Sequence, residues 1–484
     1  FKTRPAAEWE ALVNDAGGEC AVCRPSAEWV DHPHVLASET IVEVDDPEYG
    51  RMRQPGIPTR MSLTPGAVRG PARALDADRQ AVVAGLRPPT PAVSGGAPDD
   101  ASMCAALDGV RVLDLCIVLA GPTCGRTLAE YGADVVKIEA PDRPPMGAFH
   151  GDVNRAKRSI VLDLKTPEGL EVFWTLVDGA DVVVQNFRRG IAEQLGIGYE
   201  QVKARRPDIV YASLNCYGHT GPFGGRAGHE QIAQAATGMQ DRYRTADGMP
   251  QTQRYAVNDY GTGYLGAYGV ALAMLHRART GQGQHVDAAL AYTATLLQSS
   301  FLAGYDGKVW DEPRGQDAVG SGPLHRAYQA ADGWFFLGAR SAAELAAVEG
   351  LRDIDGIEAL TGDALAGALE ARFASDGVEA WVARLTAADV GAHHVVNSTD
   401  ELMDLPYAIE HGLSVTSDHE TWGAVSSTGP APRLSRTPVT AGRPAPVVGG
   451  QTREILAEAG LGERADALIA AGAAFERQTG GREG

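Results

Sequence analysis

Four side chains between residues 229 and 259 have types suited to acid–base or nucleophilic chemistry: His229, Glu230, Asp247 and Asp259. An imidazole exchanges protons near neutral pH, so His229 is a candidate general base. Asp247 is followed by Gly248-Met249-Pro250, a turn sequence that exposes a carboxylate on a loop. When such a carboxylate is shielded from water, it can attack a carbonyl carbon and form a mixed anhydride. The residue types therefore indicate acyl transfer or proton abstraction.

Each of these residues also has a purely structural interpretation that the sequence leaves open. An Asp beside Gly is often only a turn former. His229 could be a structural histidine whose ring nitrogens are satisfied by neighbours. Asp259 directly precedes the helix that we expect over 261–279, so its carboxylate could cap that helix.

Basic residues gather in two places although the chain as a whole is acidic. The 484 residues include 43 Lys and Arg against 62 Asp and Glu, a formal charge of -19. Such a surface disfavours binding to nucleic acid or to anionic membranes. The two basic clusters are Arg143, Arg155, Lys157 and Arg158, and then Arg188-Arg189. They predict a local site for a phosphate-bearing ligand, although isolated basic residues can simply be solvated.

From residue 108 onward, short β-branched runs alternate with helical stretches. This pattern favours an α/β fold with a parallel sheet covered on both faces. The expected strands are 110–115, 134–138, 159–164, 181–184 and 209–214, and the expected helices are 123–131, 167–177 and 261–279. Ligands of such sheets lie beyond the carboxyl ends of the strands. Glycine-rich stretches at 218–225 and 320–323 are interpreted as loops that could close over a substrate.

The chain opens with a copy of its own C-terminal part. Residues 1–85 repeat residues 373–460, with Trp9 matching Trp381 and Arg60–Pro65 matching Arg433–Pro438. The predicted organisation is this partial repeat (1–85), a Pro/Gly-rich linker (86–106), a large domain (107–300), a small domain (301–398) and a returning C-terminal segment (399–484). A tail copy without its own sheet would leave apolar residues unburied, so we expect residues 1–85 to pack on another unit.

Cysteine content and hydropathy indicate the cellular compartment and the kinds of ligand to expect. Six cysteines are too few for a disulfide framework, and Cys20 and Cys23 lack a second ligand pair for a metal. No apolar run reaches the length needed to cross a bilayer. We therefore expect a cytoplasmic protein without a bound metal, a nucleic-acid partner or a membrane anchor.

A set of ordered motifs resembles the family III CoA-transferases, which also include α-methylacyl-CoA racemase. The resemblance runs from about Leu107 to Leu461. The motifs are Val112–Leu115, Leu119–Pro122, Gly132–Glu139, Asn154–Ser159, Leu162–Gly169, Gln185–Arg188, Gly218–Pro222 and Arg279–Gln284.

The resemblance implies a Rossmann-like large domain with a parallel sheet, plus a smaller second domain. The family's chain leaves the large domain, forms the small one and returns, and two chains interlock like links. Because the chain opens on a tail segment, the resemblance also suggests the back portion of a tandem-fused member. The expected assembly is an interlocked homodimer or a complex with a partner subunit.

The resemblance also implies an activity and the residues for it. In the transferases, an Asp in an Asp-Gly-Pro-Pro loop stands twelve residues before a second Asp, which makes Asp247 the nucleophile here. CoA would move between an acyl-CoA thioester and a free carboxylic acid through an aspartyl anhydride and an aspartyl-CoA thioester. In the racemase, a His and an Asp thirty residues apart exchange the α-proton, as His229 and Asp259 could; Glu230 replaces the Asp that follows the racemase His. The third hypothesis is that the chain is a non-catalytic subunit that binds CoA.

Coenzyme A, bound as a substrate, is the expected ligand. The residues implied for it by the resemblance are Leu119, Ala120, Lys137, Arg155, Lys157, Arg158, Asn186, Phe187 and Arg188. Backbone amides of the glycine-rich loops would stabilise the oxyanions of the reaction.

Overall fold

The computed structural model of the chain describes residues 1–87, 105–143, 148–311, 314–439 and 443–477. It divides into two units. The first comprises Phe1–Gln240, Thr252–Lys308 and Gly412–Gly484, and the second comprises Asp241–Gln251 and Val309–His411. The linker predicted over 86–106 lies almost wholly outside the described residues. Within the described part of the chain, no helix has the length and apolar character that crossing a membrane requires.

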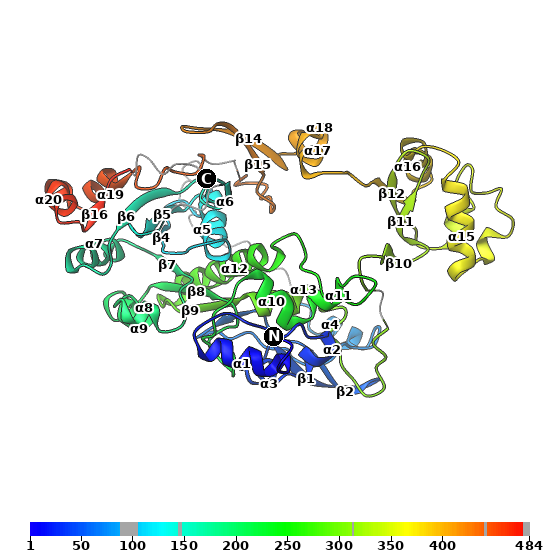
Figure 1. Ribbon diagram of the computed structural model, residues 1–484, viewed down its shortest axis with the longest axis horizontal. Helices are drawn as coiled ribbons and strands as arrows, with labels where there is room; N and C mark the ends of the chain where they lie inside the picture. The colour runs from blue at the N-terminus through cyan, green and yellow to red at the C-terminus, as the bar shows by residue number, and fades with distance from the viewer. Residues whose placement is uncertain (88–104, 144–147, 312–313, 440–442, 478–484) are drawn as a thin grey trace. The chain divides into compact units, whose positions relative to one another are not determined.

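The first unit is built on an eight-stranded sheet in the order β16-β6-β5-β4-β7-β8-β9-β3 (Figure 1). The six inner strands are parallel, while the edge strands β16 and β3 are antiparallel to their neighbours. The strands are β3 (Thr59–Met61), β4 (Arg111–Asp114), β5 (Asp134–Glu139), β6 (Arg158–Leu162), β7 (Val182–Gln185), β8 (Val210–Asn215), β9 (His285–Ala289) and β16 (Ala474–Phe475). The predicted α/β class with a parallel sheet is confirmed. Chain order reverses on the two sides of β4, which is where such folds bind ligands.

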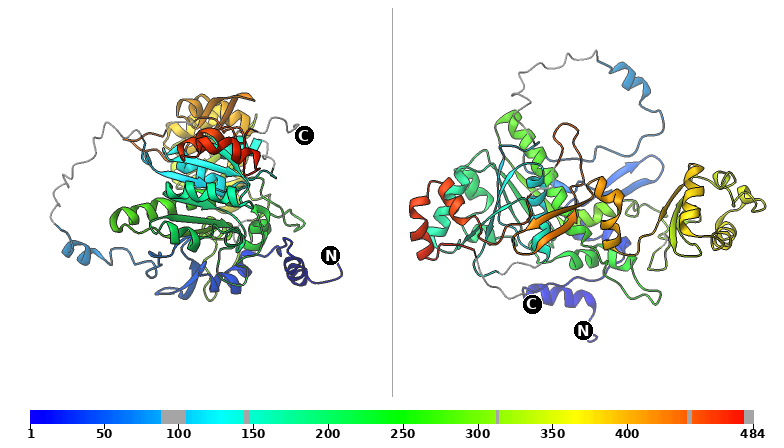
Figure 2. Two further views of the ribbon diagram at one scale, coloured as in Figure 1. Left: turned by 90° about the vertical axis from the view of Figure 1, so that its left-hand side faces the viewer. Right: turned by 90° about the horizontal axis from the view of Figure 1, so that it is seen from above.

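Helices cover both faces of this sheet, which explains why its strands are apolar throughout. One core includes Leu113, Phe173 and Leu456, from β4 and from two of the covering helices. The opposite core includes Val210 and Val286. The helices of this unit are α5 (Ala120–Glu130), α6 (Ala148–Val153), α7 (Pro167–Asp178), α8 (Ile191–Gln194), α9 (Tyr199–Arg205), α10 (Glu230–Thr237), α12 (Val257–Thr280), α13 (Leu290–Leu297), α19 (Thr452–Glu458) and α20 (Ala465–Ala470). Helix α19 contacts β6 and α20 contacts the edge strand β16, and Figure 2 shows these two helices in red.

Two helices begin earlier than the sequence suggests. Helix α5 starts at Ala120, because Pro122 fits the first turn of a helix, where its missing N–H is not needed. Helix α12 starts at Val257 after the N-cap residue Ala256, so Asp259 lies inside the first turn. The alternative that Asp259 caps this helix is therefore wrong.

Glycines let α12 lie close to α5 and the sheet. A Cβ on Gly263 would come within 2.5 Å of Thr123 Cβ, and one on Gly269 within 2.5 Å of Val286 Cγ1. The close approach holds the N-terminal turn of α12, with Asp259, beside the start of α5.

The leading segment packs on the chain's own sheet, contrary to the expectation that it covers another unit. Strand β3 pairs with β9, and Thr64 N donates to Gln284 Oε1. Trp29 is fully buried, and its Nε1 donates to Thr295 Oγ1 at 3.0 Å. The elements of this segment before β3 are α1 (Ala6–Asp15), α2 (Ser26–Val30), α3 (Pro33–Ala37), β1 (Ile41–Asp46) and β2 (Gly50–Pro55). Only α4 (Arg79–Ala84), which follows β3, buries no residue.

The second unit contains a four-stranded antiparallel sheet in the order β10-β11-β12-β13. Its core includes Tyr328, Phe335, Phe373 and Trp381. Its elements are α11 (Met239–Arg242, at the boundary), β10 (Gly320–Gly322), β11 (His325–Gln329), β12 (Trp334–Gly338), α14 (Ala342–Leu345), η1 (Ile357–Ala359), α15 (Gly362–Phe373), α16 (Val378–Ala387), β13 (Gly391–His394), α17 (Thr399–Asp404) and α18 (Pro406–Glu410). After the second unit, the chain returns to the first unit at Gly412. This returning part contains the hairpin of β14 (Ser414–His419) and β15 (Gly423–Thr428), and later η2 (Gly462–Arg464).

We predict that Trp29→Ala lowers the free energy of unfolding by about 3–5 kcal/mol, because it empties a large buried site and leaves Thr295 without its donor. Urea denaturation of the full chain measures the loss. Trp9→Ala, at a partly buried indole of the same segment, is the control and should cost clearly less stability than Trp29→Ala. Equal stability of the two variants would show that the leading segment is not integrated into the fold.

Candidate active site

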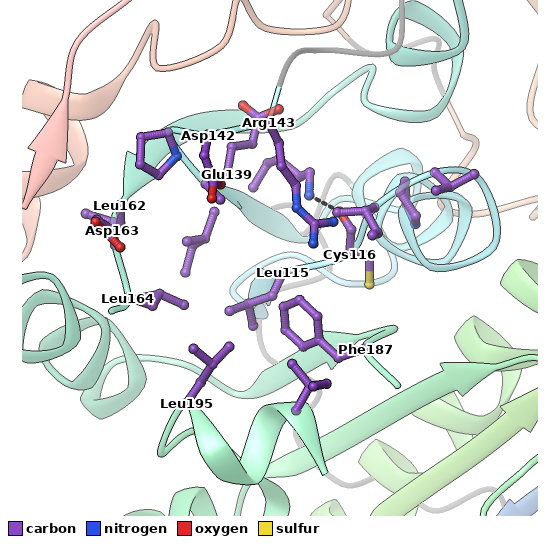
Figure 3. A pocket seen from close by; sticks show the side chains of 18 of the residues that line it. Leu115, Cys116, Glu139, Asp142, Arg143, Leu162, Asp163, Leu164, Phe187 and Leu195 are labelled. Atoms are coloured by element: carbon purple, nitrogen blue, oxygen red, sulfur yellow. Dashed lines mark hydrogen bonds between the residues drawn. The ribbon is translucent and has the colours of Figure 1, made fainter. Parts of the chain in front are cut away.

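Two contiguous cavities lie beyond the carboxyl ends of the parallel strands. Cavity A, of about 450 Å³, is lined by Leu115, Glu139 and Leu162 at the ends of β4, β5 and β6, and by Phe187 after β7 (Figure 3). Cavity B is larger, at about 1070 Å³. The residues that line both cavities are Ile117, Val118, Arg143, Phe187 and Ile191. One elongated ligand could therefore occupy both.

Cavity B brings together most of the residues predicted for the site. Three of the four candidate catalytic side chains line it, and so do five of the nine residues expected to bind CoA. They are His229, Glu230, Asp259, Leu119, Ala120, Asn186, Phe187 and Arg188.

Two buried carboxyl groups form the chemical centre of cavity B. Glu230 is 3% exposed and Asp259 is 6% exposed. Glu230 is held by three donors, each at 2.7 Å: Asp259 N, Asn258 Nδ2 and Gln234 Nε2. These contacts tie the first turn of α10 to the first turn of α12, so the two acids keep a fixed relation.

The environment of the two acids shifts their protonation. Burial, and then the negative charge of Glu230, raises the pKa of Asp259 to about 7. Burial also raises the pKa of Glu230, although its three hydrogen bonds favour the ionised form. Two carboxyl groups in one dry site resist ionising together. Asp259 is consequently balanced between its neutral and ionised forms near neutral pH, and its carboxylate is poorly hydrated.

His229 occupies the N-cap position of α10, directly before Glu230. Its ring is about half exposed, and Nδ1 lies 2.5 Å from Glu19 Oε2. Glu19 also accepts a hydrogen bond from Arg188 Nη2 at 3.2 Å. All three side chains line cavity B. Glu19 was not among the predicted residues, and it comes from the leading segment.

The loop between β4 and α5 is fixed by Asn186. Its Oδ1 accepts from Ile117 N at 2.8 Å, and its Nδ2 donates to the Ile117 carbonyl at 2.7 Å. The next residue, Val118, has a φ of +66°, which is unfavourable for a β-branched side chain and needs such support. Asn186 thereby positions Leu119 and Ala120 at the wall of cavity B.

Two lysines predicted to bind CoA, Lys137 and Lys157, are buried and paired within the chain. Lys157 Nζ donates to Asp114 Oδ2 at 2.7 Å, and also to Pro122 O and Asn154 Oδ1. Lys137 Nζ donates to the Cys116 carbonyl and lies 3.9 Å from Asp114 Oδ1. Burial alone would raise the pKa of Asp114, but the two lysines hold it below its ordinary value. The two ammonium groups share one carboxylate, and Lys137 also lines cavity A.

Arg155 and Arg158 are likewise engaged in ion pairs. Arg155 Nε donates to Glu130 Oε1 at 2.6 Å. Arg158 donates to Asp134 and to Glu454 and Glu458 of α19, which ties the C-terminal segment to the sheet. Neither arginine, nor Lys157, is among the described lining residues of cavities A and B, whereas Lys137 and Arg143 are. The structure thus gives Arg155, Lys157 and Arg158 a framework role around the cavities.

Other cations line the cavities directly. Arg143 lines both, Lys165 lines cavity A, and Arg189 and Arg254 line cavity B with Arg188. Figure 3 shows the Arg143 side chain directed into cavity A. Arg254 was missed by the sequence analysis, although it stands only five residues before Asp259. The amide of Gly218, expected to serve an oxyanion, already donates to Asn215 Oδ1.

Asp247 lies in the second unit, on an exposed turn. Thr245 Oγ1 donates to its carboxylate, and Gly248 N donates to the Thr245 carbonyl at 2.9 Å. The hydrogen bond from Thr245 lowers the pKa of Asp247. The described lining of cavity B does not include this residue. Its environment is that of a solvated turn aspartate.

Metal coordination has no candidate in the described part of the chain, where no group of three or more His, Cys, Asp or Glu side chains could hold an ion.

Comparison with known proteins identifies the family. Residues 1–79 and 107–452 match the model of CoA-transferase family III, so the chain belongs to this family. It is similar to succinyl-CoA:glutarate CoA-transferase of Mus musculus, with 32% identity over 73% of this chain and 86% of that protein. It is also similar to alpha-methylacyl-CoA racemase of Homo sapiens, with 31% identity over 74% of this chain and 94% of that protein.

A solved structure agrees with this assignment. The CAIB/BAIF family protein from Brucella suis is 29% identical, has a TM-score of 0.63, and is covered over its full length by 74% of this chain. The predicted resemblance is confirmed, and the chain is an enzyme of the class that transfers CoA between acyl-CoA thioesters and acids.

We predict that Asp259→Asn stabilises the protein at pH 8 but not at pH 4. The folded-state pKa of about 7 exceeds the unfolded value of about 3.9, so the folded protein binds more protons between these values. Wild-type stability must then fall as pH rises from about 4 to about 7, by roughly 2–4 kcal/mol. Urea denaturation across this range measures the difference.

The control for this experiment is Asp247→Asn, because Asp247 is exposed and its pKa is lowered instead of raised. Its stability should follow the wild-type pH curve above pH 5. Parallel wild-type and Asp259→Asn curves would show that Asp259 is not buried beside a second acid.

Proposed function

We propose that this enzyme moves CoA between an acyl-CoA thioester and a free carboxylate, with Asp259 as the nucleophile. The observation that carries the proposal is the burial of Asp259 beside Glu230 in cavity B, with a pKa of about 7. A carboxylate that has lost its hydration shell attacks a carbonyl more readily than a solvated one. Asp247 was the residue implied by the family motif, but its carboxylate is solvated. The burial of Asp259 within the first unit supports its choice as the nucleophile.

The reaction proceeds in two pairs of displacements. An oxygen of the Asp259 carboxylate attacks the thioester carbon, the C–O bond forms, the C–S bond breaks, and CoA thiolate leaves a mixed anhydride. The thiolate then attacks the Asp259 carbonyl and releases the acyl group as a carboxylate, leaving an aspartyl-CoA thioester. The acceptor acid reverses these steps and departs as the new thioester. Because no water takes part, the thioester energy is retained.

Cavity A is the proposed site for the nucleotide part of CoA, and cavity B for its thioester arm. Phe187, Leu115 and Leu164 offer cavity A an apolar wall for the adenine ring. Arg143 and Lys165 offer cations for the phosphates. Arg143 lines both cavities, as a ligand that extends from one to the other requires.

The acyl groups of the substrates are proposed to carry a second carboxylate group, which the arginines of cavity B can bind. The mouse relative is named for succinyl-CoA and glutarate, so this pair is the first to test. Arg189 and Arg254 are the candidates for a second carboxylate group.

Assembly with a second large unit is a further part of the proposal, either as an interlocked homodimer or with a partner subunit. It is supported by the unequal environments of the two repeat copies. In the trailing copy, Ile455 and Leu456 of α19 are buried in the core. The matching Val82 and Val83 of α4, at the repeat offset of 373, are each 61% exposed.

We predict that Asp259→Asn reduces CoA exchange at least ~1000-fold, because the attacking oxygen is lost. CoA transfer from a panel of CoA esters to free acids, followed by mass spectrometry, measures the rate. Asp247→Asn, with the same chemical change on the exposed turn, should stay within a few-fold of wild type. An inactive Asp247→Asn with an active Asp259→Asn would overturn the assignment.

Exchange of the α-proton is the second candidate function. It is favoured by the presence of His229 and Asp259 in one cavity, since the pKa of Asp259 leaves part of the population protonated at neutral pH. One residue could remove a proton while the other returns one.

For this second function, we expect deuterium from heavy water to enter the α-carbon of a bound acyl-CoA without any acceptor acid. His229→Ala should abolish the incorporation, and NMR or mass spectrometry measures it. If wild-type enzyme exchanges CoA but incorporates no deuterium, the second function is excluded.

A further inference from the structure

One wall of cavity B is supplied by the repeated leading segment. Glu19 lines the cavity, and its carboxylate contacts His229 Nδ1 at 2.5 Å and Arg188 Nη2 at 3.2 Å. Glu19 and His229 are 210 residues apart in the chain. We propose that Glu19 is a positioning residue for His229, which makes the leading segment a working part of the active site. This inference rests on the proposed function.

Glu19 is held rigidly by its own segment. Within this segment, Asn14 Nδ2 donates to the Cys20 carbonyl at 2.8 Å, and Val22 N donates to Glu10 Oε1 at 3.0 Å. Glu10 is itself buried and paired with Arg24 at 2.7 Å. The loop that carries Glu19 is thus fixed on both sides of the residue.

The same loop is joined to the helix that carries His229. Arg24 N donates to the Ala235 carbonyl of α10 at 3.1 Å. Arg188 Nη1 donates to the Gly17 carbonyl at 3.2 Å, which joins the loop to the residues after β7. Glu19 and His229 therefore belong to one connected framework, and their contact is not a chance meeting of two surface side chains.

A carboxylate on Nδ1 determines what the imidazole offers to the cavity. Glu19 accepts only from a protonated Nδ1, so the neutral ring presents an unprotonated Nε2, and the imidazolium presents Nε2–H. The imidazolium form would donate to the oxyanion that develops when Asp259 attacks the thioester. The neutral form would accept the α-proton in the exchange reaction. Without Glu19, the ring would be free to rotate and to change tautomer.

Glu19 also holds the side chain of Arg188 in place. The guanidinium shares the carboxylate with His229, so one anion holds both side chains at the wall of cavity B. Removing the charge would release Arg188 from a defined position beside the predicted CoA-binding residues Asn186 and Phe187.

The test is Glu19→Gln in the full chain, with Glu8→Gln as matched control. Glu8 is an exposed acid of the same segment whose partner is Arg4. We expect Glu19→Gln to lower kcat for CoA exchange about 10- to 100-fold, with a smaller rise in KM for the acyl-CoA because Arg188 loses its partner. The pH profile of kcat should change, whereas a purely structural role would leave its shape unaltered. Glu19→Asp, which keeps the charge, should recover part of the rate.

The outcomes separate this inference from the proposed function. If Asp259→Asn is inactive while Glu19→Gln keeps the wild-type kcat and pH profile, the role of Glu19 is refuted and the function stands. If Asp259→Asn remains active, the proposed nucleophile is refuted whatever Glu19 does. If Glu19→Gln loses thermal stability and Glu19→Asp shows the same kcat as Glu19→Gln, Glu19 is structural and the inference is wrong.

Discussion

Cavity B is organised around the burial of Asp259 next to Glu230. Glu230 binds the first turn of α12 through Asp259 N and Asn258 Nδ2, so it orients the residue that it also repels electrostatically. Burying two acids together is unfavourable for stability, and the surrounding fold has to compensate for it. In return, one carboxylate is kept dry and available at neutral pH. The glycines of α12 contribute by letting this helix lie against α5 and the sheet.

The buried ion pairs around Asp114 fix the loop between β4 and α5, which lines both cavities. Lys157 connects Asp114, at the end of β4, to Pro122 in the first turn of α5 and to Asn154. Breaking such a pair by removing one partner typically costs about 3–5 kcal/mol. The loop between β4 and α5, which lines both cavities, is therefore fixed by buried charge on one side and by Asn186 on the other. Arg155, Lys157 and Arg158, which were predicted to bind CoA, are held in ion pairs within the chain.

Much of the fold could be predicted because local patterns are strong where strands are buried on both faces. The runs around Val182–Val184 and Val210–Leu214 are continuous apolar stretches that the sheet buries from both faces. The start of α12 was misplaced because Val257 and Asn258 have weak helix propensities, and their helical state depends on contacts with Glu230. The ion pair between Lys157 and Asp114 could not be predicted either, because Asp114 lies 43 residues earlier in the chain.

Part of the candidate site could be predicted by residue type, and the roles of these residues stay predictions. His229, Glu230 and Asp259 line one cavity. Asp247 was also predicted from a family motif, but it lies on an exposed turn. Burial distinguishes the two aspartates, and spacing alone does not report burial. Glu19 could not be inferred from local sequence, because its contact depends on where the repeated segment folds back.

The most direct test of the account is to locate the covalent intermediate. The enzyme would be incubated with an acyl-CoA, trapped with hydroxylamine and digested with trypsin. Cleavage at Arg244, Arg254 and Arg277 yields peptide 245–254, whose one acid is Asp247, and peptide 255–277, whose one acid is Asp259. The account predicts that mass spectrometry finds the hydroxamate on peptide 255–277. A modification on peptide 245–254 would contradict it.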